Sequence, residues 1–272
     1  MATQSGSGLK MYNLSHELSH NMPQWPSPFS PPLVTNKLLY HGMHDQYVVE
    51  YDGILHRGTH MDSPIHVQSN TPYLNEFELW KFFGTGVAVS IPKGKWEVIT
   101  PEDLENATPR IEPGDIVMIN TGTHRLYGDN DDYYSYSPGL YTDAAQWLVD
   151  RKVKLVGVDV QALDHPLGTR MAEHGPGPIL PHLIDEYRAM TGREVADDFP
   201  DWEPAHHILL LNGIPGIENI GGDLDAVTGK RCTFLAFPSR FNQGDGSPIR
   251  VVAVVDPDQS FRIPTFEQSE TR

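Results

Sequence analysis

The residues best suited to chemistry are concentrated in one run, His56-Arg57-Gly58-Thr59-His60-Met61-Asp62-Ser63-Pro64-Ile65-His66. Its three histidines and its aspartate all occupy even-numbered positions. Successive side chains of an extended strand point to opposite faces, so an extended backbone would present all four on one face. The run therefore predicts a cluster of imidazoles around one carboxylate.

Two residues of this run, Gly58 and Pro64, disfavour a helix. The four-residue spacing of His56 and His60 is therefore not that of a helical zinc pair. On a slightly bent strand, His60 and Asp62 would reach a single ion. Two imidazoles and a carboxylate suit zinc or manganese, with coordination positions left for water. The same residue types are also found in buried hydrogen-bond networks, and that alternative stays open.

A second group of candidate ligands lies downstream. His206 and His207 open the apolar run Ile208–Leu211, and Glu218 follows a Gly-Pro turn. We expect the apolar run to be a strand, on which only one of two adjacent histidines can face the site. An acid beyond the turn is well placed to return to the same pocket, although an acidic residue in a solvated loop is the simpler interpretation of Glu218.

The elements that must position these residues are mostly strands. The predicted strands are rich in Val and Ile and bounded by Gly, Pro or Asp; they are Gln46–Tyr51, Thr85–Ile91, Asp115–Asn120, Lys154–Val160, Ile208–Leu211, Thr233–Phe237 and Ile249–Val255. Helices are predicted after the N-cap Thr100, over Thr142–Lys152 and over Leu180–Thr191. The strand-helix-strand order around Thr142–Lys152 predicts a parallel pair, and the whole predicts a mixed α/β fold.

The chain is expected to form a single domain, residues 1–272, because no change in composition marks a linker. Residues 1–9 are small and polar and are expected to be a flexible leader. Residues 171–204 combine a Gly-Pro-Gly-Pro segment, a short helix and an acidic tail, and are expected to be an inserted excursion near the site. Asp164 and His165 follow a predicted strand end, where α/β proteins often bind ligands, and are candidates to support the site.

Composition excludes several classes of function. The net charge of −16 disfavours binding to nucleic acid. No apolar run approaches the roughly 20 residues needed to span a bilayer, so no membrane association is expected. Cys232 is the only cysteine, which rules out an intramolecular disulfide and fits a reducing, cytoplasmic location.

The run from His56 to His66 resembles, at every defined position, the HxGTHxDxPxH signature of the "putative cyclase" metal hydrolases, a family that includes bacterial kynurenine formamidase and isatin hydrolase. Three further segments resemble the opening, centre and closing turn of that family; they are Leu14–Leu18 with Met22–Pro26, Gly114–Thr123, and Asp245–Arg250. The resemblance implies a swivelling β/β/α domain with a central mixed sheet, and a homodimer or homotetramer.

Carried over position by position, the resemblance implies roles for individual residues. His56, His60 and Asp62 would hold a first divalent ion, Mn²⁺ or Zn²⁺, and His66 would act as the acid–base group. A second ion would share the aspartate and add a histidine and, twelve residues later, a glutamate. His206 and Glu218 have that separation and His207 does not, so we expect His206 to face the site. Whether the chain holds one ion or two stays open.

The resulting functional hypothesis is hydrolysis of a C–N bond in an aryl formamide or an isatin-like cyclic amide by metal-activated water. The small-molecule substrate would contact Trp25, which Pro23 and Pro26 hold on a stiff loop. A lactone hydrolase or a true cyclase on the same scaffold is the alternative enzyme. A metal-storing or ligand-binding protein without turnover is the alternative outside enzymes, and an acid–base histidine beside an open coordination position argues against it.

Overall fold

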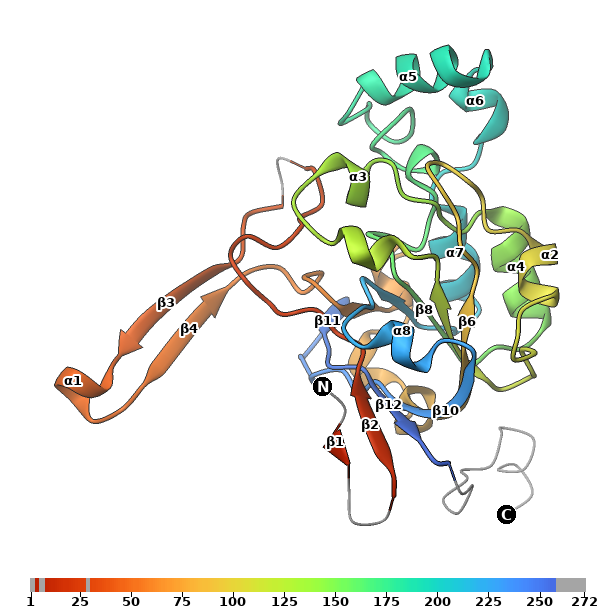
Figure 1. The fold of residues 1–272 in the computed structure, drawn as a ribbon. Helices are drawn as coiled ribbons and strands as arrows, with labels where there is room; N and C mark the ends of the chain where they lie inside the picture. Colours follow the sequence, from red (N-terminus) through yellow and green to blue (C-terminus); the bar gives the residue numbers. More distant parts are fainter. Residues whose placement is uncertain (1–2, 5–7, 28–29, 258–272) are drawn as a thin grey trace.

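The computed structural model describes residues 3–4, 8–27 and 30–257. Within these ranges ten strands form one sheet in the order β1-β2-β12-β10-β6-β7-β8-β9-β5-β11 (Figure 1). Their bounds, in sheet order, are β1 Thr3–Gln4, β2 Lys10–Asn13, β12 Val252–Val255, β10 Lys230–Leu235, β6 Phe83–Ser90, β7 Ile116–Asn120, β8 Leu155–Val158, β9 Gly216–Glu218, β5 His60–Asp62 and β11 Gly246–Pro248. The predicted α/β class with a central mixed sheet is confirmed.

The centre of the sheet is parallel and its flanks are antiparallel. Strands β6, β7, β8 and β9 run parallel to one another. Every residue of β7 and β8 is buried, as expected for parallel strands covered on both faces. Helix α4 (Thr142–Asp150) connects β7 to β8, so the predicted parallel crossover is confirmed.

Helices cover the sheet on the side where α4 and α7 (Pro204–Leu211) pack against each other (Figure 1). Val117 and Ile119 of β7 belong to the apolar cluster beneath these helices, whereas Ile116 and Met118 belong to the cluster on the opposite face. The remaining helical segments are α1 His41–His44, α2 Pro101–Glu105, α3 Asp131–Tyr134, α5 His182–Thr191, α6 Val195–Asp198, α8 Leu224–Val227, and the 3₁₀ turns Pro64–His66, Leu74–Glu76, Leu79–Phe82, Thr123–Leu126 and Pro166–Gly168.

The predicted start of α2 has the expected capping geometry. The Thr100 hydroxyl accepts a hydrogen bond from the Asp103 backbone N–H at 3.2 Å, and the Asp103 carboxylate accepts one from the Thr100 N–H at 2.8 Å. This reciprocal capping box satisfies two N–H groups that the first turn of a helix leaves free.

The prediction of a strand at Ile208–Leu211 is wrong, because these residues complete helix α7. Pro204 occupies the first turn, where its missing N–H costs nothing. The next two backbone N–H groups donate to Asp164, at 2.6 Å from Ala205 and 3.0 Å from His206. An acceptor about forty residues away in the sequence thus caps the helix, and the local apolar pattern does not reveal it.

A two-stranded hairpin, β3 (Val34–Leu39) and β4 (Val48–Asp52), extends away from the body as an arm (Figure 1). The strand predicted at Gln46–Tyr51 is its second half. All residues of the two strands except Leu39 are exposed. Large apolar side chains are frequent among the exposed residues of the arm, namely Val34, Leu38, Tyr40, Met43, Tyr47, Val48, Val49 and Tyr51.

The 171–204 segment lies beside the sheet-helix body and carries α5 and α6 (Figure 1). It packs through a third apolar cluster, which includes Leu183, Val195 and Phe199 and also takes in Trp96 from the body. Within the segment expected to be a flexible leader, Thr3–Gln4 pairs with β2. Met1–Ala2 and residues 5–7 lie outside the described residues. Among the described helices, none is both long enough and apolar enough to cross a bilayer.

Candidate metal centre

Strand β5 carries the first two candidate ligands between two short neighbours. His60 lies opposite Glu218 of β9, and Asp62 lies opposite Gly246 of β11. The intervening Met61 is fully buried in the apolar cluster, so His60 and Asp62 share the other face, as the alternation of a strand requires. The pairing places a histidine, an aspartate and a glutamate on adjacent strands.

The prediction of one extended segment from His56 to His66 is wrong outside β5. Gly58 has a φ of 55° and turns the chain before the strand, and His66 lies in a 3₁₀ turn after it. The turns nevertheless return the His56 ring to the site, with its Nδ1 2.7 Å from Asp62 Oδ1. Gly246 leaves room for that ring, since a Cβ there would lie 2.8 Å from His56 Cε1.

The second half of the site comes from α7 and β9. His206 Nε2 lies 3.1 Å from Glu218 Oε1 and 3.5 Å from Asp62 Oδ2. His207 is half-buried, and its Nδ1 lies 2.9 Å from the Glu203 carbonyl oxygen. The structure thus brings His206, and not His207, to Asp62 and Glu218. Because both residues lie in helix α7, the helix and not the alternation of a strand points the rings of His206 and His207 in different directions.

Among the residues that the structure describes, three groups of side chains have ligand atoms close enough to hold an ion. The first is His56, His60 and Asp62, and the second is Asp62, His206 and Glu218. Asp62 belongs to both groups. Glu218 is buried, so the simpler interpretation as a solvated loop acid is wrong.

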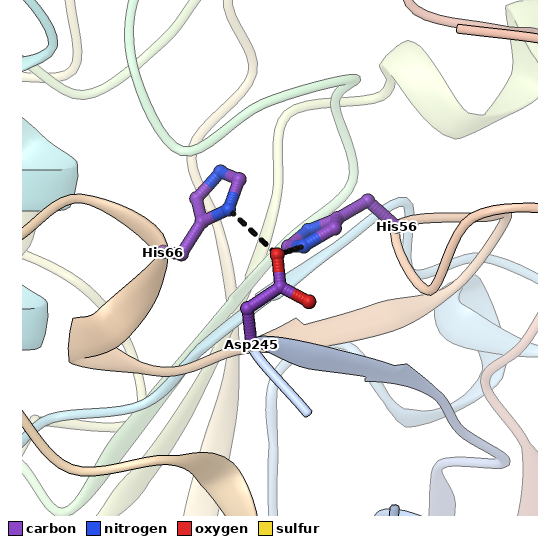
Figure 2. A group of neighbouring side chains, drawn as sticks. All are labelled: His56, His66 and Asp245. Atoms are coloured by element: carbon purple, nitrogen blue, oxygen red, sulfur yellow. Dashed lines mark hydrogen bonds and ion pairs between the residues drawn. The ribbon is translucent and has the colours of Figure 1, made fainter. Parts of the chain in front are cut away.

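The third group adds a residue that sequence reasoning did not single out. Figure 2 shows Asp245 between His56 and His66, with one carboxylate oxygen 2.8 Å from His56 Nε2 and 3.4 Å from His66 Nδ1. The segment Asp245–Arg250 is the one that resembles the closing turn of the family, and that resemblance is the one signal in the sequence that points to it. Asp245 directly precedes β11, which brings it beside the signature run.

The other candidates have different surroundings. Asp164 contacts His206, with its Oδ2 2.6 Å from His206 Nδ1. His165 instead stacks on Phe199 with ring centroids 4.2 Å apart. Trp25 is half-buried and packs against the cluster that anchors the 171–204 segment. The structure therefore brings Asp164 to the site and turns His165 away from it.

The hydrogen bonds of two histidines direct their free nitrogens into the cluster. His60 Nδ1 lies 2.8 Å from the Gly58 carbonyl oxygen, which only accepts, so this nitrogen carries a proton. His206 Nδ1 donates to Asp164 in the same way. The Nε2 atoms of both rings then face the carboxylates, and this is the nitrogen that each ring would offer to a metal ion.

The buried Asp62 carboxylate is the clearest sign that the group fits a cation. Both of its oxygens are buried without a well-directed hydrogen bond among the described residues. Three imidazole nitrogens nevertheless surround them, at 2.7 Å for His56, 3.4 Å for His60 and 3.5 Å for His206. Nitrogen and oxygen donors converging without hydrogen-bond geometry are suited to sharing an ion.

The carboxylates and imidazoles of the cluster shift one another's pKa values. Burial alone would lower the pKa of His56, but the carboxylates of Asp62 and Asp245 outweigh it and raise the pKa to about 10. Burial would likewise raise the pKa of Glu218, yet His206 and His60 hold it at about 2. In the metal-free protein His56 therefore carries a proton, which supplies part of the positive charge that a divalent cation would bring.

Exposure increases across the cluster in one direction. The side chains of Asp62 and His60 are 1% and 4% exposed, whereas those of His66 and Asp245 are 35% and 44% exposed. Asp62 and His60 therefore lie at the inner end of the cluster, and His66 and Asp245 lie at its entrance. A small molecule would approach from the side of His66 and Asp245.

Nearly the whole chain is similar to several known proteins. The chain is 24% identical over 242 residues to the kynurenine formamidase of Bacillus mycoides (strain KBAB4), covering 88% of this chain and 95% of that one. Its fold resembles isatin hydrolase A from Ralstonia solanacearum, with a TM-score of 0.73 and 20% identity over 91% of this chain and 92% of that one. A potential metal-dependent hydrolase with cyclase activity matches with a TM-score of 0.64 and 20% identity, over 92% of this chain and 100% of that one.

The family model described as "Putative cyclase" matches residues 12–165, which include the run from His56 to His66. This match covers more than half of the chain. The chain belongs to the putative cyclase family.

Proposed function

We propose that the protein is a metal-dependent hydrolase that cleaves the C–N bond of an aryl formamide or of an isatin-like cyclic amide. The observation that carries the proposal is the convergence of four side chains on the buried carboxylate of Asp62; they are His56, His60, His206 and Glu218. The kynurenine formamidases and isatin hydrolases that it resembles support the class of substrate.

In this proposal two of the three ligand groups hold one divalent ion each. His56, His60 and Asp62 bind the first, and Asp62, His206 and Glu218 bind the second. The set of imidazoles and carboxylates suits Mn²⁺ or Zn²⁺. The position of Glu218 Oε1, 3.1 Å from His206 Nε2, completes a second ligand group with Asp62 and favours two ions over one.

The ions would supply an acidified water and polarise the carbonyl of the substrate. His66 acts as the general base and then as the general acid. Its Nδ1 faces Asp245, which leaves Nε2 free to take a proton from the attacking water and deliver it to the leaving nitrogen as the C–N bond breaks. Asp245 orients the ring and compensates the positive charge that forms on it.

An activity screen tests the class of reaction. We expect hydrolysis of a formanilide or an isatin-type lactam, complete loss of the activity with a chelator, and its return with Mn²⁺ or Zn²⁺. A phenyl ester and an aryl lactone serve as controls. Turnover of the lactone alone would assign the chain to lactone hydrolysis, and metal binding without any turnover would make it a metal-binding protein.

Trp25 is proposed to contact the aromatic part of the substrate. It is half-buried on the loop between β2 and β3 and packs on the 171–204 cluster, so a substrate contact here would link that excursion to the site. Trp25→Ala should raise KM for aryl substrates with little change in kcat, and Trp25→Phe should restore most of the affinity. A fall in kcat at unchanged KM would contradict this role.

A homodimer or homotetramer is proposed on the basis of the arm. A two-stranded hairpin is at best marginally stable alone in water, and this one exposes many large apolar side chains. Sedimentation of the wild type should give at least a dimer, and Met43→Glu with Tyr51→Glu should shift it towards the monomer.

The single buried Cys232 also suits the cytoplasmic location that we propose.

A further inference from the structure

Asp164 is a buried carboxylate that holds one candidate ligand and the helix that carries it. The residue is 1% exposed and follows β8, where a bridge to Leu140 fixes its backbone. One oxygen accepts the N–H of Ala205 at 2.6 Å. The other accepts the N–H of His206 at 3.0 Å and the Nδ1–H of the same residue at 2.6 Å. The two carboxylate oxygens thus accept three hydrogen bonds.

The residue before it, Leu163, holds Glu218, another member of the same ligand group. The backbone N–H of Leu163 donates to Glu218 Oε1 at 2.7 Å. Two consecutive residues of one loop therefore hold His206 and Glu218. The first ligand group has no such external support for His60, whose Nδ1 donates to the carbonyl of Gly58 in the turn before its own strand.

We propose that Leu163–Asp164 is the positioning element for the second ion, with Asp164 fixing the His206 ring so that its Nε2 lone pair faces Asp62 and Glu218. The inference rests on the proposed two-ion site. Asp164 is a positioning residue, because it acts through His206 and contacts the other side of the ring. Its removal should weaken the second ion and leave the first unchanged.

Asparagine at this position separates charge and hydrogen bonding from side-chain shape. An amide offers one accepting oxygen and one NH₂ group. In either orientation the NH₂ of Asn would face an N–H group, of Ala205 or of His206. Facing His206, it would also meet Nδ1 and favour the tautomer whose Nε2 carries the proton. The second ligand group is thereby misaligned or blocked.

The test is a metal titration of chelator-treated wild type and Asp164→Asn, followed by calorimetry and elemental analysis. We expect the wild type to bind two ions per chain. In the variant the second ion should bind about 10–100-fold more weakly, as is usual when the partner of a ligating histidine is lost. The first ion should keep its affinity. The readout is binding, so it does not depend on turnover.

The chain offers a matched control in Asp159. This carboxylate is also fully buried, and it accepts several backbone N–H groups and the Nδ1 of a histidine, His124, at 3.0 Å. His124 belongs to none of the ligand groups. Asp159→Asn should lower the melting temperature as Asp164→Asn does, while both ions bind with wild-type affinity.

The outcomes separate this inference from the proposed function. A wild type that binds a single ion removes the two-ion site and, with it, the inference. With two ions in the wild type, an unchanged second affinity in Asp164→Asn, or an equal weakening of both ions, overturns the positioning role alone. Should Asp164→Asn fail to fold, Asp164→Glu keeps both oxygens but displaces them, and the same loss confined to the second ion is expected.

Discussion

The two halves of the candidate metal centre are built in different ways. His56, His60 and Asp62 come from seven consecutive residues, a glycine turn followed by β5. His206 and Glu218 come from a helix and a strand held by a loop about fifty residues earlier in the chain. The first half depends on local backbone geometry and the second on tertiary packing. Substitution of the shared carboxylate, of the second half alone, or of residues outside both halves should therefore change the metal content by different amounts.

Asp62→Ala should have the largest effect, because Asp62 is the one carboxylate common to both groups. We expect the metal content to fall from about two ions per chain to nearly none, with activity at background, since each ion of a two-metal site needs its share of the bridging charge. Elemental analysis after gel filtration measures it. Retention of either ion would show that the halves do not share this ligand.

Removal of His206 should affect only the second half. His206→Ala should retain about one ion per chain in place of two, as for the loss of one position of a two-metal site. His207→Ala, one residue along the same helix, is the control and should keep both ions and most of the activity. The reverse result would mean that α7 presents its other histidine to the site.

Removal of His66 should leave both halves intact. His66→Ala should keep its metal but lose roughly 10²–10⁴-fold in turnover, the usual contribution of a positioned acid–base group. Steady-state kinetics on protein of measured metal content tests this. Loss of metal together with turnover would make His66 a ligand and enlarge the first half.

A change far from both halves should alter stability alone. Thr100→Ala removes the cap of α2 and should lower the free energy of unfolding by about 1 kcal/mol, with metal content unchanged. Urea denaturation measures the loss, and Thr100→Ser should restore most of it. Altered metal binding in Thr100→Ala would argue that the site responds to general destabilisation, which would weaken every comparison above.

The first half of the site could be predicted well because its information is local. The spacing around Gly58 and the match to a family signature are enough to identify His56, His60, Asp62 and His66. Glu218 and His206 are identified only through the twelve-residue separation typical of the family. The strand predicted at Ile208–Leu211 is a helix, because the cap that Asp164 provides is invisible to a local apolar pattern. His206 does lie beside Glu218, but the strand alternation from which this was expected is absent.

Asp245 shows the remaining gap. It lies 189 residues from His56 in the chain, and the pairing of β11 with β5 brings the two together. A single aspartate before the sequence Gly-Ser-Pro has no property of its own that marks it as a partner of two histidines. Sheet order across such a separation follows from the whole fold, and so the entrance of the site was less predictable than its inner end.

The β3–β4 arm has a consequence for how the protein behaves on dilution. Only a short segment separates the end of the arm at Asp52 from His56. If a second copy covers the apolar side chains of the arm, association stabilises the folded arm increasingly as protein concentration rises. The chain that follows the arm, beginning at His56, is stabilised with it. Melting temperature and specific activity would then rise together with protein concentration until the assembly is saturated. The hairpin would couple the occupancy of a subunit contact to the order of the candidate metal ligands that follow it.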